Sequence, residues 1–226
     1  MVCKTKNKKA LEFFNIGNSY LESNKLSDAR LFLYAAVKLD SNFCDAWDNL
    51  SVCCRRMGQY KDAFNSGIHS VLIDSTNPTA WLNCGTAAFL SNNINLALYL
   101  FDHMQHIIPN DPEGYYGKSL VLYSIDSISE ARINISQAEQ CYKSNNTPIG
   151  PDVYLLYGFI EYKNGNKKEA QKYFKKIYSK FRNNPELNYF YGMCLMENEN
   201  DIKKYKKYLD KAKALGYTEE NENVQK

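Results

Sequence analysis

The sequence predicts an all-α fold in which pairs of antiparallel helices are stacked in tandem. Two registers with one shared period carry this prediction. Alanines recur every 34 residues, at Ala29, Ala63, Ala97 and Ala131. Aromatic residues recur at the same interval, at Phe13, Trp47, Trp81 and Tyr115. A repeat of this length makes one helical hairpin, which cannot bury both of its faces alone, so neighbouring hairpins must stack to form a core.

Local patterns support the hairpins. Ala29, Leu33 and Ala36 have the spacing of a helix that is buried along one side. Turn sequences divide each repeat into two helices, for example KNGNK at residues 163–167. A small residue follows each aromatic anchor at a fixed place, and we expect it to let the two helices of a hairpin approach closely. The glycines at this place are Gly17, Gly85, Gly158 and Gly192.

These residues resemble the tetratricopeptide repeat (TPR), whose pattern is W-x2-L-G-x2-Y…A-x3-F…P. Two further units follow the 34-residue series, one with Tyr157-Gly158, Ala170 and Phe174, and one with Tyr191-Gly192. The resemblance implies a right-handed superhelical α-solenoid of helix-turn-helix hairpins. It also implies that the first helices line a concave groove, which commonly holds an extended peptide or a helix of another protein.

The predicted organisation has three parts. A basic N-terminal segment covers residues 1–9, one array covers 10–215, and a flexible acidic tail covers 216–226. Within the array, Asn, Pro and Gly predict a loop at 145–150. The six repeats are placed at residues 10–43, 44–77, 78–111, 112–144, 151–184 and 185–215.

Composition excludes several classes of protein. The chain has 28 basic and 25 acidic residues and a net charge of +3, a balance that does not by itself indicate nucleic-acid or membrane binding. No apolar run reaches the roughly 20 residues that span a bilayer. We therefore expect no nucleic-acid partner and no membrane span. The lysines of the C-terminal part, such as Lys168, Lys172, Lys175 and Lys176, are interpreted as a solvated face.

Seven cysteines occur without a C-x-x-C pair. We interpret all of them as small buried side chains in a reducing compartment, which predicts a cytoplasmic protein. An alternative is a lipid anchor on Cys3, exposed by removal of an upstream signal. The chain would then resemble the TPR assembly factors of bacterial outer-membrane machines.

No catalytic constellation is evident. The sequence contains no P-loop and no G-x-G-x-x-G motif. His103 and His106 lie three residues apart near Asp102, but two histidines without a third fixed ligand are a weak metal signal. A metal-dependent enzyme is therefore a remote alternative. We expect no enzymatic activity, no cofactor and no bound metal.

Asparagines mark the expected groove. Asn15, Asn49 and Asn83 occupy the same place in the first three repeats. Side-chain amides can both donate to and accept from a peptide backbone, so they form either a binding ladder or a feature common to the family. Asn18 and Asn49 also match the asparagines of the TPR clamp for chaperone carboxylates. Phe14, Thr79 and Asn83 replace the three cations of that clamp, which argues against this function.

The other groove candidates are a cation and three aromatic residues. Arg55, beside Arg56, either contacts an anion or lies in solvent. Tyr116, Tyr123 and Tyr162 are expected on the groove side of the later repeats, where tyrosine would serve as an amphipathic contact residue. The sequence thus predicts a non-enzymatic scaffold or adaptor that binds a peptide or helix of another protein. The lysine-rich last helix favours a monomer.

Overall fold

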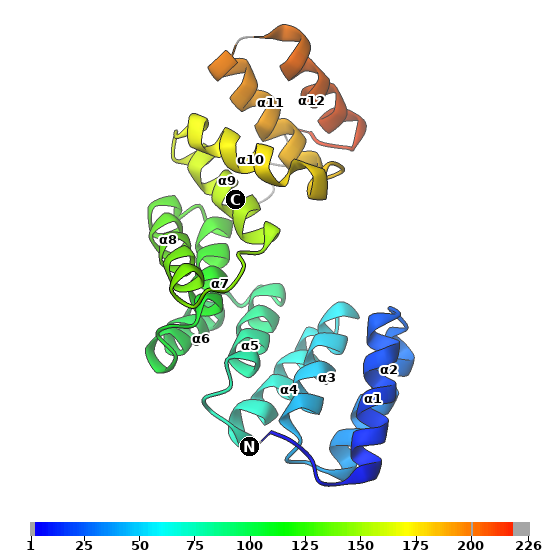
Figure 1. Ribbon diagram of the computed structural model, residues 1–226. Coiled ribbons are helices and arrows are strands. Elements are labelled where there is room, and N and C mark those ends of the chain that lie inside the picture. Colours follow the sequence, from blue (N-terminus) through cyan, green and yellow to red (C-terminus); the bar gives the residue numbers. More distant parts are fainter. Residues whose placement is uncertain (1–2, 200, 219–226) are drawn as a thin grey trace. The chain divides into compact units, whose positions relative to one another are not determined.

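The computed structural model describes residues 3–199 and 201–218 (Figure 1), and the regular secondary structure of this part is α-helical, without strands. Its helices are α1 (Lys8–Glu22), α2 (Leu26–Leu39), α3 (Cys44–Arg56), α4 (Tyr60–Ile73), α5 (Pro78–Leu90), α6 (Ile94–Ile107), α7 (Pro112–Ser124), α8 (Ile128–Ser144), α9 (Pro151–Lys163), α10 (Lys167–Phe181), α11 (Pro185–Glu199) and α12 (Ile202–Ala214). The predicted all-α class and the tandem pairing of helices are confirmed.

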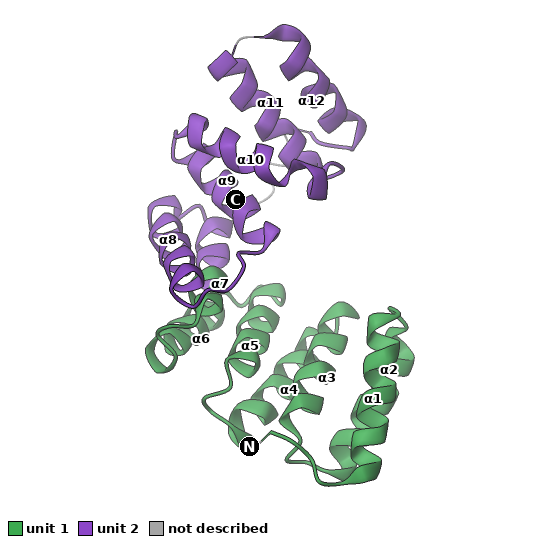
Figure 2. Ribbon diagram, in the orientation of Figure 1, with its two compact units in different colours: residues 1–117 green, residues 118–226 purple. Residues whose placement is uncertain are grey.

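The chain divides into two compact units, residues 1–117 and residues 118–226, with the boundary inside α7 (Figure 2). Unit 1 contains α1 to α6 and the start of α7. Unit 2 contains the end of α7 and α8 to α12.

In both units the first helices of successive hairpins adjoin one another. In unit 1, α3 packs on both α1 and α5, whereas the backbones of α2, α4 and α6 do not approach one another, and the Arg30–Asp62 ion pair joins α2 to α4 by side chains alone. In unit 2, α9 touches α11, while α10 packs on both of them. A layer whose first helices lie closer together than its second helices curves towards the first helices. We call the side formed by α1, α3 and α5 the inner face of unit 1.

Inside each hairpin, the small residue of the first helix packs on the second helix close to the recurring alanine. A Cβ atom added to Gly158 would lie 2.4 Å from the Phe174 ring, on the facing helix. The second and fourth repeats carry serine instead of glycine. The hydroxyl of Ser51 donates to the Ala63 carbonyl at 2.7 Å, and that of Ser119 donates to the Ala131 carbonyl at 2.8 Å. The expected close approach of the helices is therefore present in the structure.

The aromatic register fastens each hairpin to the connection before it. The indole N–H of Trp47 donates to the Ser41 carbonyl at 2.9 Å, and that of Trp81 donates to the Ser75 carbonyl at 2.8 Å. The Tyr115 hydroxyl makes the equivalent bond, to the carbonyl of Pro109. This bond explains why the 34-residue spacing selects an aromatic side chain with a polar hydrogen in repeats two to four.

The N-terminal segment corrects one prediction. Cys3 and Cys44 form a disulfide, so the expectation of seven free thiols is wrong for these two. The segment folds back on the first hairpin, where Thr5 bonds to Asp40 and the Asn7 side chain donates to the Leu39 carbonyl. A separation of 41 residues gave no sign of this pairing. The other five cysteines are free and buried, as expected.

Helix α12 ends just before Gly216. Its φ of 88° is a left-handed conformation that glycine adopts without strain. The amides of Gly216 and Tyr217 donate to the carbonyls of Lys213 and Ala212, which closes α12 with a Schellman motif. Tyr217 is buried and stacks on Tyr189 at 4.2 Å between ring centroids. The expected flexible tail therefore does not begin at Gly216, and residues 219–226 of it lie outside the described part.

Candidate interaction surface

The asparagines of the predicted ladder lie in three different environments. Asn15 is exposed on α1. Asn49 is half-buried, and its amide donates to the Asn18 side-chain oxygen at 2.7 Å, which joins α3 to α1. Asn83 is buried, and its amide donates to the Asp48 carbonyl at 3.3 Å, which joins α5 to α3. The three side chains thus differ in how much polar capacity they leave for a ligand.

Asp48 is a buried carboxylate on α3 without a cationic partner in the described residues. One oxygen accepts a 2.8 Å bond from Asn77, and the other oxygen, Oδ1, is buried without any hydrogen bond. Burial raises the pKa of Asp48, since it disfavours the charged form, while the bonds from Asn77 and Ser70 act in the opposite direction. The carboxylate is therefore an electrostatic cost to unit 1.

Sequence reasoning missed Asp48, although a signal was available. The repeat register aligns it with Phe14 and Leu82, each 34 residues away. A carboxylate stands where the neighbouring repeats have an apolar side chain. Asp45, one turn earlier on α3, also has a raised pKa because it is partly buried, with Lys4 acting against the shift.

Arg55 and Arg56 differ sharply, although they are adjacent. Arg56 donates to the Leu21 carbonyl at 3.0 Å and to the Asn24 side chain at 2.8 Å, so it closes the end of α1. Arg55 is half-buried, and its Nε is buried without a hydrogen-bond partner in the described residues. Burial lowers the pKa of Arg55, and repulsion by Arg56 lowers it further. Of the two candidates, Arg55 is the one whose Nε is buried without a partner in the described residues.

The three tyrosines of the predicted aromatic half are half-buried. Tyr116 lies in unit 1, and Tyr123 and Tyr162 lie in unit 2. Tyr123 stacks on Phe159 at 6.2 Å, and Tyr162 packs on Phe190 at 4.7 Å. The rings of Tyr123 and Tyr162 therefore form part of the packing of unit 2.

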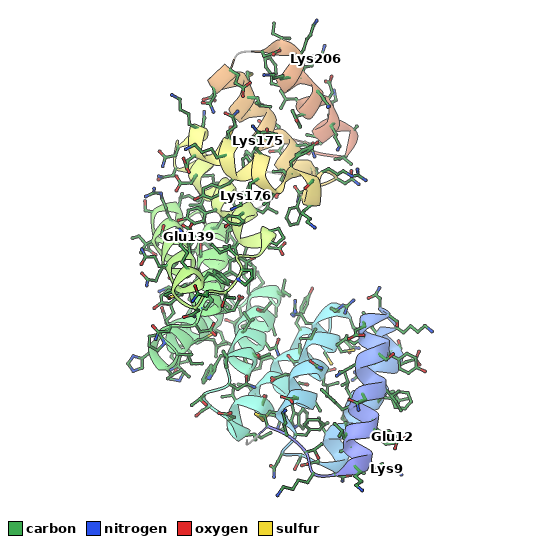
Figure 3. All side chains as sticks on the ribbon, in the orientation of Figure 1. Lys9, Glu12, Glu139, Lys175, Lys176 and Lys206 are labelled. Atoms are coloured by element: carbon green, nitrogen blue, oxygen red, sulfur yellow. A yellow bond between two sulfur atoms is a disulfide. The ribbon has the colours of Figure 1, made fainter. Side chains whose placement is uncertain are left out.

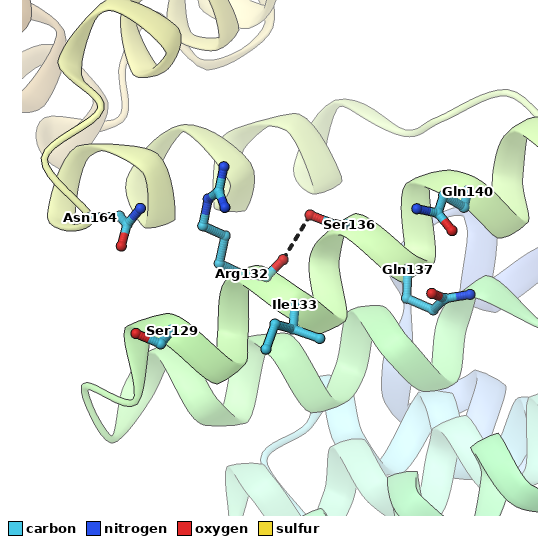
Figure 4. A pocket seen from close by; sticks show the side chains of 7 residues that line it. All are labelled: Ser129, Arg132, Ile133, Ser136, Gln137, Gln140 and Asn164. Atoms are coloured by element: carbon cyan, nitrogen blue, oxygen red, sulfur yellow. Dashed lines mark hydrogen bonds between the residues drawn. The ribbon is translucent and has the colours of Figure 1, made fainter.

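A polar hollow of about 480 Å³ lies along α8 (Figure 4). Arg132 lies at its wall and donates from Nε to buried Glu161 at 2.7 Å. Asn166 donates to the other oxygen of Glu161 at 2.6 Å. Because Glu161 neutralises Arg132 and is itself fully bonded, this ion pair fastens α8 to α9 and leaves no net charge for a ligand.

Many lysines of unit 2 lie on its second helices, and three of them are labelled in Figure 3. Lys175 and Lys176 are exposed on α10, and Lys206 is exposed on α12. Lys176 lies over the ring of Tyr154, 3.7 Å from its centroid. Lys172 pairs with Glu169 at 2.6 Å. The basic face is thus partly satisfied within its own helix and by a neighbouring ring.

Two of the three histidines serve in packing. His69 stacks on Trp47 at 4.4 Å between centroids, and His103 packs on Trp81 at 4.6 Å. His106 is exposed. Over residues 3–199 and 201–218, no three His, Cys, Asp or Glu side chains come together as a metal site. The same search range contains no helix that is both long and apolar enough to cross a membrane.

In this structure the sulfur of Cys3 is not free to carry the lipid anchor considered as an alternative. Its sulfur is bonded to Cys44. A sulfur in a disulfide cannot at the same time form the thioether of a lipid anchor.

Comparison with known proteins places the fold. Residues 151–179 match the family model of the tetratricopeptide repeat. A chain of the APC/C hetero-tetramer Cut9-Hcn1 has a similar fold, with a TM-score of 0.80 and 16% identity over 93% of this chain and 40% of that one. This protein thus spans less than half of the Cut9-Hcn1 chain that it resembles.

Two further structures are similar over most of both chains. PilF of Pseudomonas aeruginosa has a TM-score of 0.69 and 16% identity, over 92% of this chain and 99% of that one. YrrB, described as a TPR protein with an unusual peptide-binding site, has a TM-score of 0.56 and 16% identity, over 81% and 92%. No protein in the curated sequence comparison matches this chain. At these identities the likeness concerns the fold.

Proposed function

We propose that this chain, whose residues 151–179 match the tetratricopeptide repeat model and whose fold is similar to that of solved TPR structures, is a non-enzymatic scaffold that binds a segment of another protein. We place the binding surface on the inner face of unit 1. The partner is an extended peptide or a helix, and the scaffold itself is a monomer.

One observation carries the proposal. Asn18 and Asn49 meet at the seam between α1 and α3, and their mutual bond uses only the Asn49 nitrogen and the Asn18 oxygen. The Asn18 nitrogen and the Asn49 oxygen have no partner in the described part of the chain. An extended peptide backbone offers a carbonyl and an N–H in alternation, and a donor beside an acceptor matches that pattern.

The surroundings support the same face. Exposed Asn15 lies on α1, three residues before Asn18, and so on the same side of the helix. Asn83 is the least suited of the ladder residues, because its amide is buried and engaged with Asp48. YrrB, a similar fold, is described as having a peptide-binding site. The proposed surface therefore rests on the Asn18–Asn49 pair, with Asn15 beside it.

The test compares three versions of the full chain as bait in a native lysate. They are the wild type, the double variant Asn18→Ala, Asn49→Ala, and a matched control, Asn65→Ala, Asn183→Ala. Both control residues are exposed and lie off the inner face. We expect a protein that the wild type and the control retain and that the double variant loses, while all three melt alike. Equal retention by the double variant would exclude this surface.

Oligomeric state needs a separate measurement. We expect multi-angle light scattering to give about 26 kDa, the mass of one chain, across a tenfold range of concentration. A mass that rises towards twice this value would show self-association.

A further inference from the structure

We propose that Arg55 is a carboxylate-binding subsite on the inner face of unit 1, so that the partner segment carries an acidic group at this place. The inference rests on the proposed function, because it names the chemistry of the segment that the scaffold binds. The carboxylate belongs either to an Asp or Glu side chain or to the C-terminus of the partner.

The position of Arg55 follows from the helices that its neighbours on α3 contact. Ser51 bonds to α4, Cys53 to the Leu26 carbonyl of α2, and Arg56 to the end of α1. Arg55 follows Asp48 by seven residues, which on an α-helix brings it back to the same side, about 10 Å further along. Asp48 faces Asn77 and Asn83, before and within α5. Arg55 therefore lies on the α5 side of the last turn of α3.

The charge of Arg55 has no counterpart within the described residues. It forms no ion pair there, and the other charge that acts on it is Arg56, which repels it. The nearest comparison on the same unit is Arg30 of α2, which pairs with Asp62 at 3.4 Å. A partly desolvated guanidinium without an anion is unfavourable for folding. A ligand that supplies the anion would recover that free energy on binding.

The unused hydrogen-bonding atoms fit a carboxylate on a peptide. The buried Nε of Arg55 is a donor without a partner, and the fork of the guanidinium matches the two oxygens of a carboxylate. Four residues later, the side-chain oxygen Oε1 of Gln59 is a buried acceptor without a partner. The terminal N–H groups of the half-buried guanidinium are the donors that a carboxylate of a peptide would meet.

The test is a peptide selection on the immobilised full chain. Random peptides are displayed in two formats, one with the C-terminus fused and one with it free. The baits are the wild type, Arg55→Gln and the matched control Arg30→Gln. We expect the wild type and the control to enrich an acidic group at one position and Arg55→Gln to lose this preference. Enrichment in both formats assigns the carboxylate to a side chain, and enrichment with a free C-terminus alone assigns it to the terminus.

A second experiment changes the peptide and leaves the protein unchanged, so its result does not depend on whether an Arg55 variant folds. A selected peptide and its copy with the acidic group neutralised, by Glu→Gln, Asp→Asn or C-terminal amidation, are titrated against the wild type. We expect neutralisation to weaken binding by about tenfold to a hundredfold. Arg55→Lys, which keeps the charge and loses the fork, should bind the acidic peptide more weakly than the wild type does.

The outcomes separate the two proposals. Enriched peptides without an acidic preference, or with one that survives Arg55→Gln, would overturn the subsite and leave the scaffold function standing. If the wild type enriches no peptide in either format, both proposals fail.

Discussion

Asp48 shows how one residue departs from the repeat that contains it. The register gives this place to an apolar side chain in the neighbouring repeats, and Asp48 fills it with a buried carboxylate. Asn77 satisfies one oxygen, and the second has no bond within the described residues. The buried, unpaired charge makes the stability of unit 1 depend on pH.

The sign of that dependence follows from the raised pKa of Asp48. The folded chain binds this proton more tightly than the unfolded chain does, so protonation stabilises the fold at low pH. This contribution is lost as the pH rises from the ordinary value of 3.8 through the raised pKa. We expect Asp48→Asn to have a higher free energy of unfolding than the wild type at pH 7, with a gap that narrows towards pH 4.

Urea denaturation at both pH values measures this gap. The control is Asp28→Asn, an exposed aspartate on α2, for which we expect little change. A lower free energy of unfolding for Asp48→Asn at pH 7 would contradict the account of an uncompensated charge.

A second residue-scale prediction concerns the indole N–H of Trp81. Trp81→Phe keeps an aromatic ring against His103 and removes the 2.8 Å bond to the Ser75 carbonyl. We expect a loss of about 1 kcal/mol in the free energy of unfolding, the typical net value of one hydrogen bond. Phe13 occupies the same register in the first repeat without a polar hydrogen, so Phe13→Leu is the control in which no such bond can be lost.

At the scale of the element, each hairpin depends on the space left by one small residue. In the fifth repeat Phe174 packs where a Cβ at position 158 would lie, at 2.4 Å. The second and fourth repeats use a serine hydroxyl bonded to the signature alanine instead. A glycine at this place therefore leaves room for the side chain four residues after the alanine, whereas a serine bonds to the alanine carbonyl.

This contact predicts that Gly158→Ala destabilises unit 2. The added methyl group overlaps the Phe174 ring, whose movement is limited because Phe174 is fully buried. We expect a loss of about 1–3 kcal/mol, the usual cost of overpacking. Gly150→Ala is the control, since a Cβ there meets no atom within 4 Å. Thermal unfolding followed by circular dichroism measures both, and equal melting temperatures would refute the close-packing argument.

At the scale of the whole molecule, the Cys3–Cys44 disulfide ties the start of the chain to the second hairpin. Sequence reasoning expected every thiol to be reduced and placed the protein in the cytoplasm. Disulfides persist mainly in oxidising compartments. The bond therefore makes the redox state of the purified protein a direct test of that expectation.

A thiol count decides the matter. In denaturant without reductant we expect five reactive thiols, and seven after reduction, in agreement with the five free cysteines. Cys3→Ser should lower the free energy of unfolding of the oxidised protein by about 3–4 kcal/mol, because the bridge closes a loop of 41 residues in the unfolded chain. Seven reactive thiols before reduction would show that the bond is absent, and would restore Cys3 as a free sulfur.

The sequence by itself determined the fold, because the fold repeats. Ala29, Ala63 and Trp47, Trp81 recur at one interval, and local contacts within and between adjacent hairpins reproduce that interval in space. The register also placed Asn18, Asn49 and Arg55 on first helices, as observed.

Only the tertiary structure decided which hydrogen-bonding and charged groups of these side chains are left for a ligand. The amide of Asn83 donates to the Asp48 carbonyl, and the guanidinium of Arg56 donates to the end of α1. Arg55, in contrast, has no anionic partner among the described residues. The Cys3–Cys44 bond was likewise invisible in the sequence. These contacts join residues of different helices, or join a terminal segment to a helix. The helical period of a sequence indicates which side of its helix a residue lies on, but it does not indicate which residue of another element lies opposite.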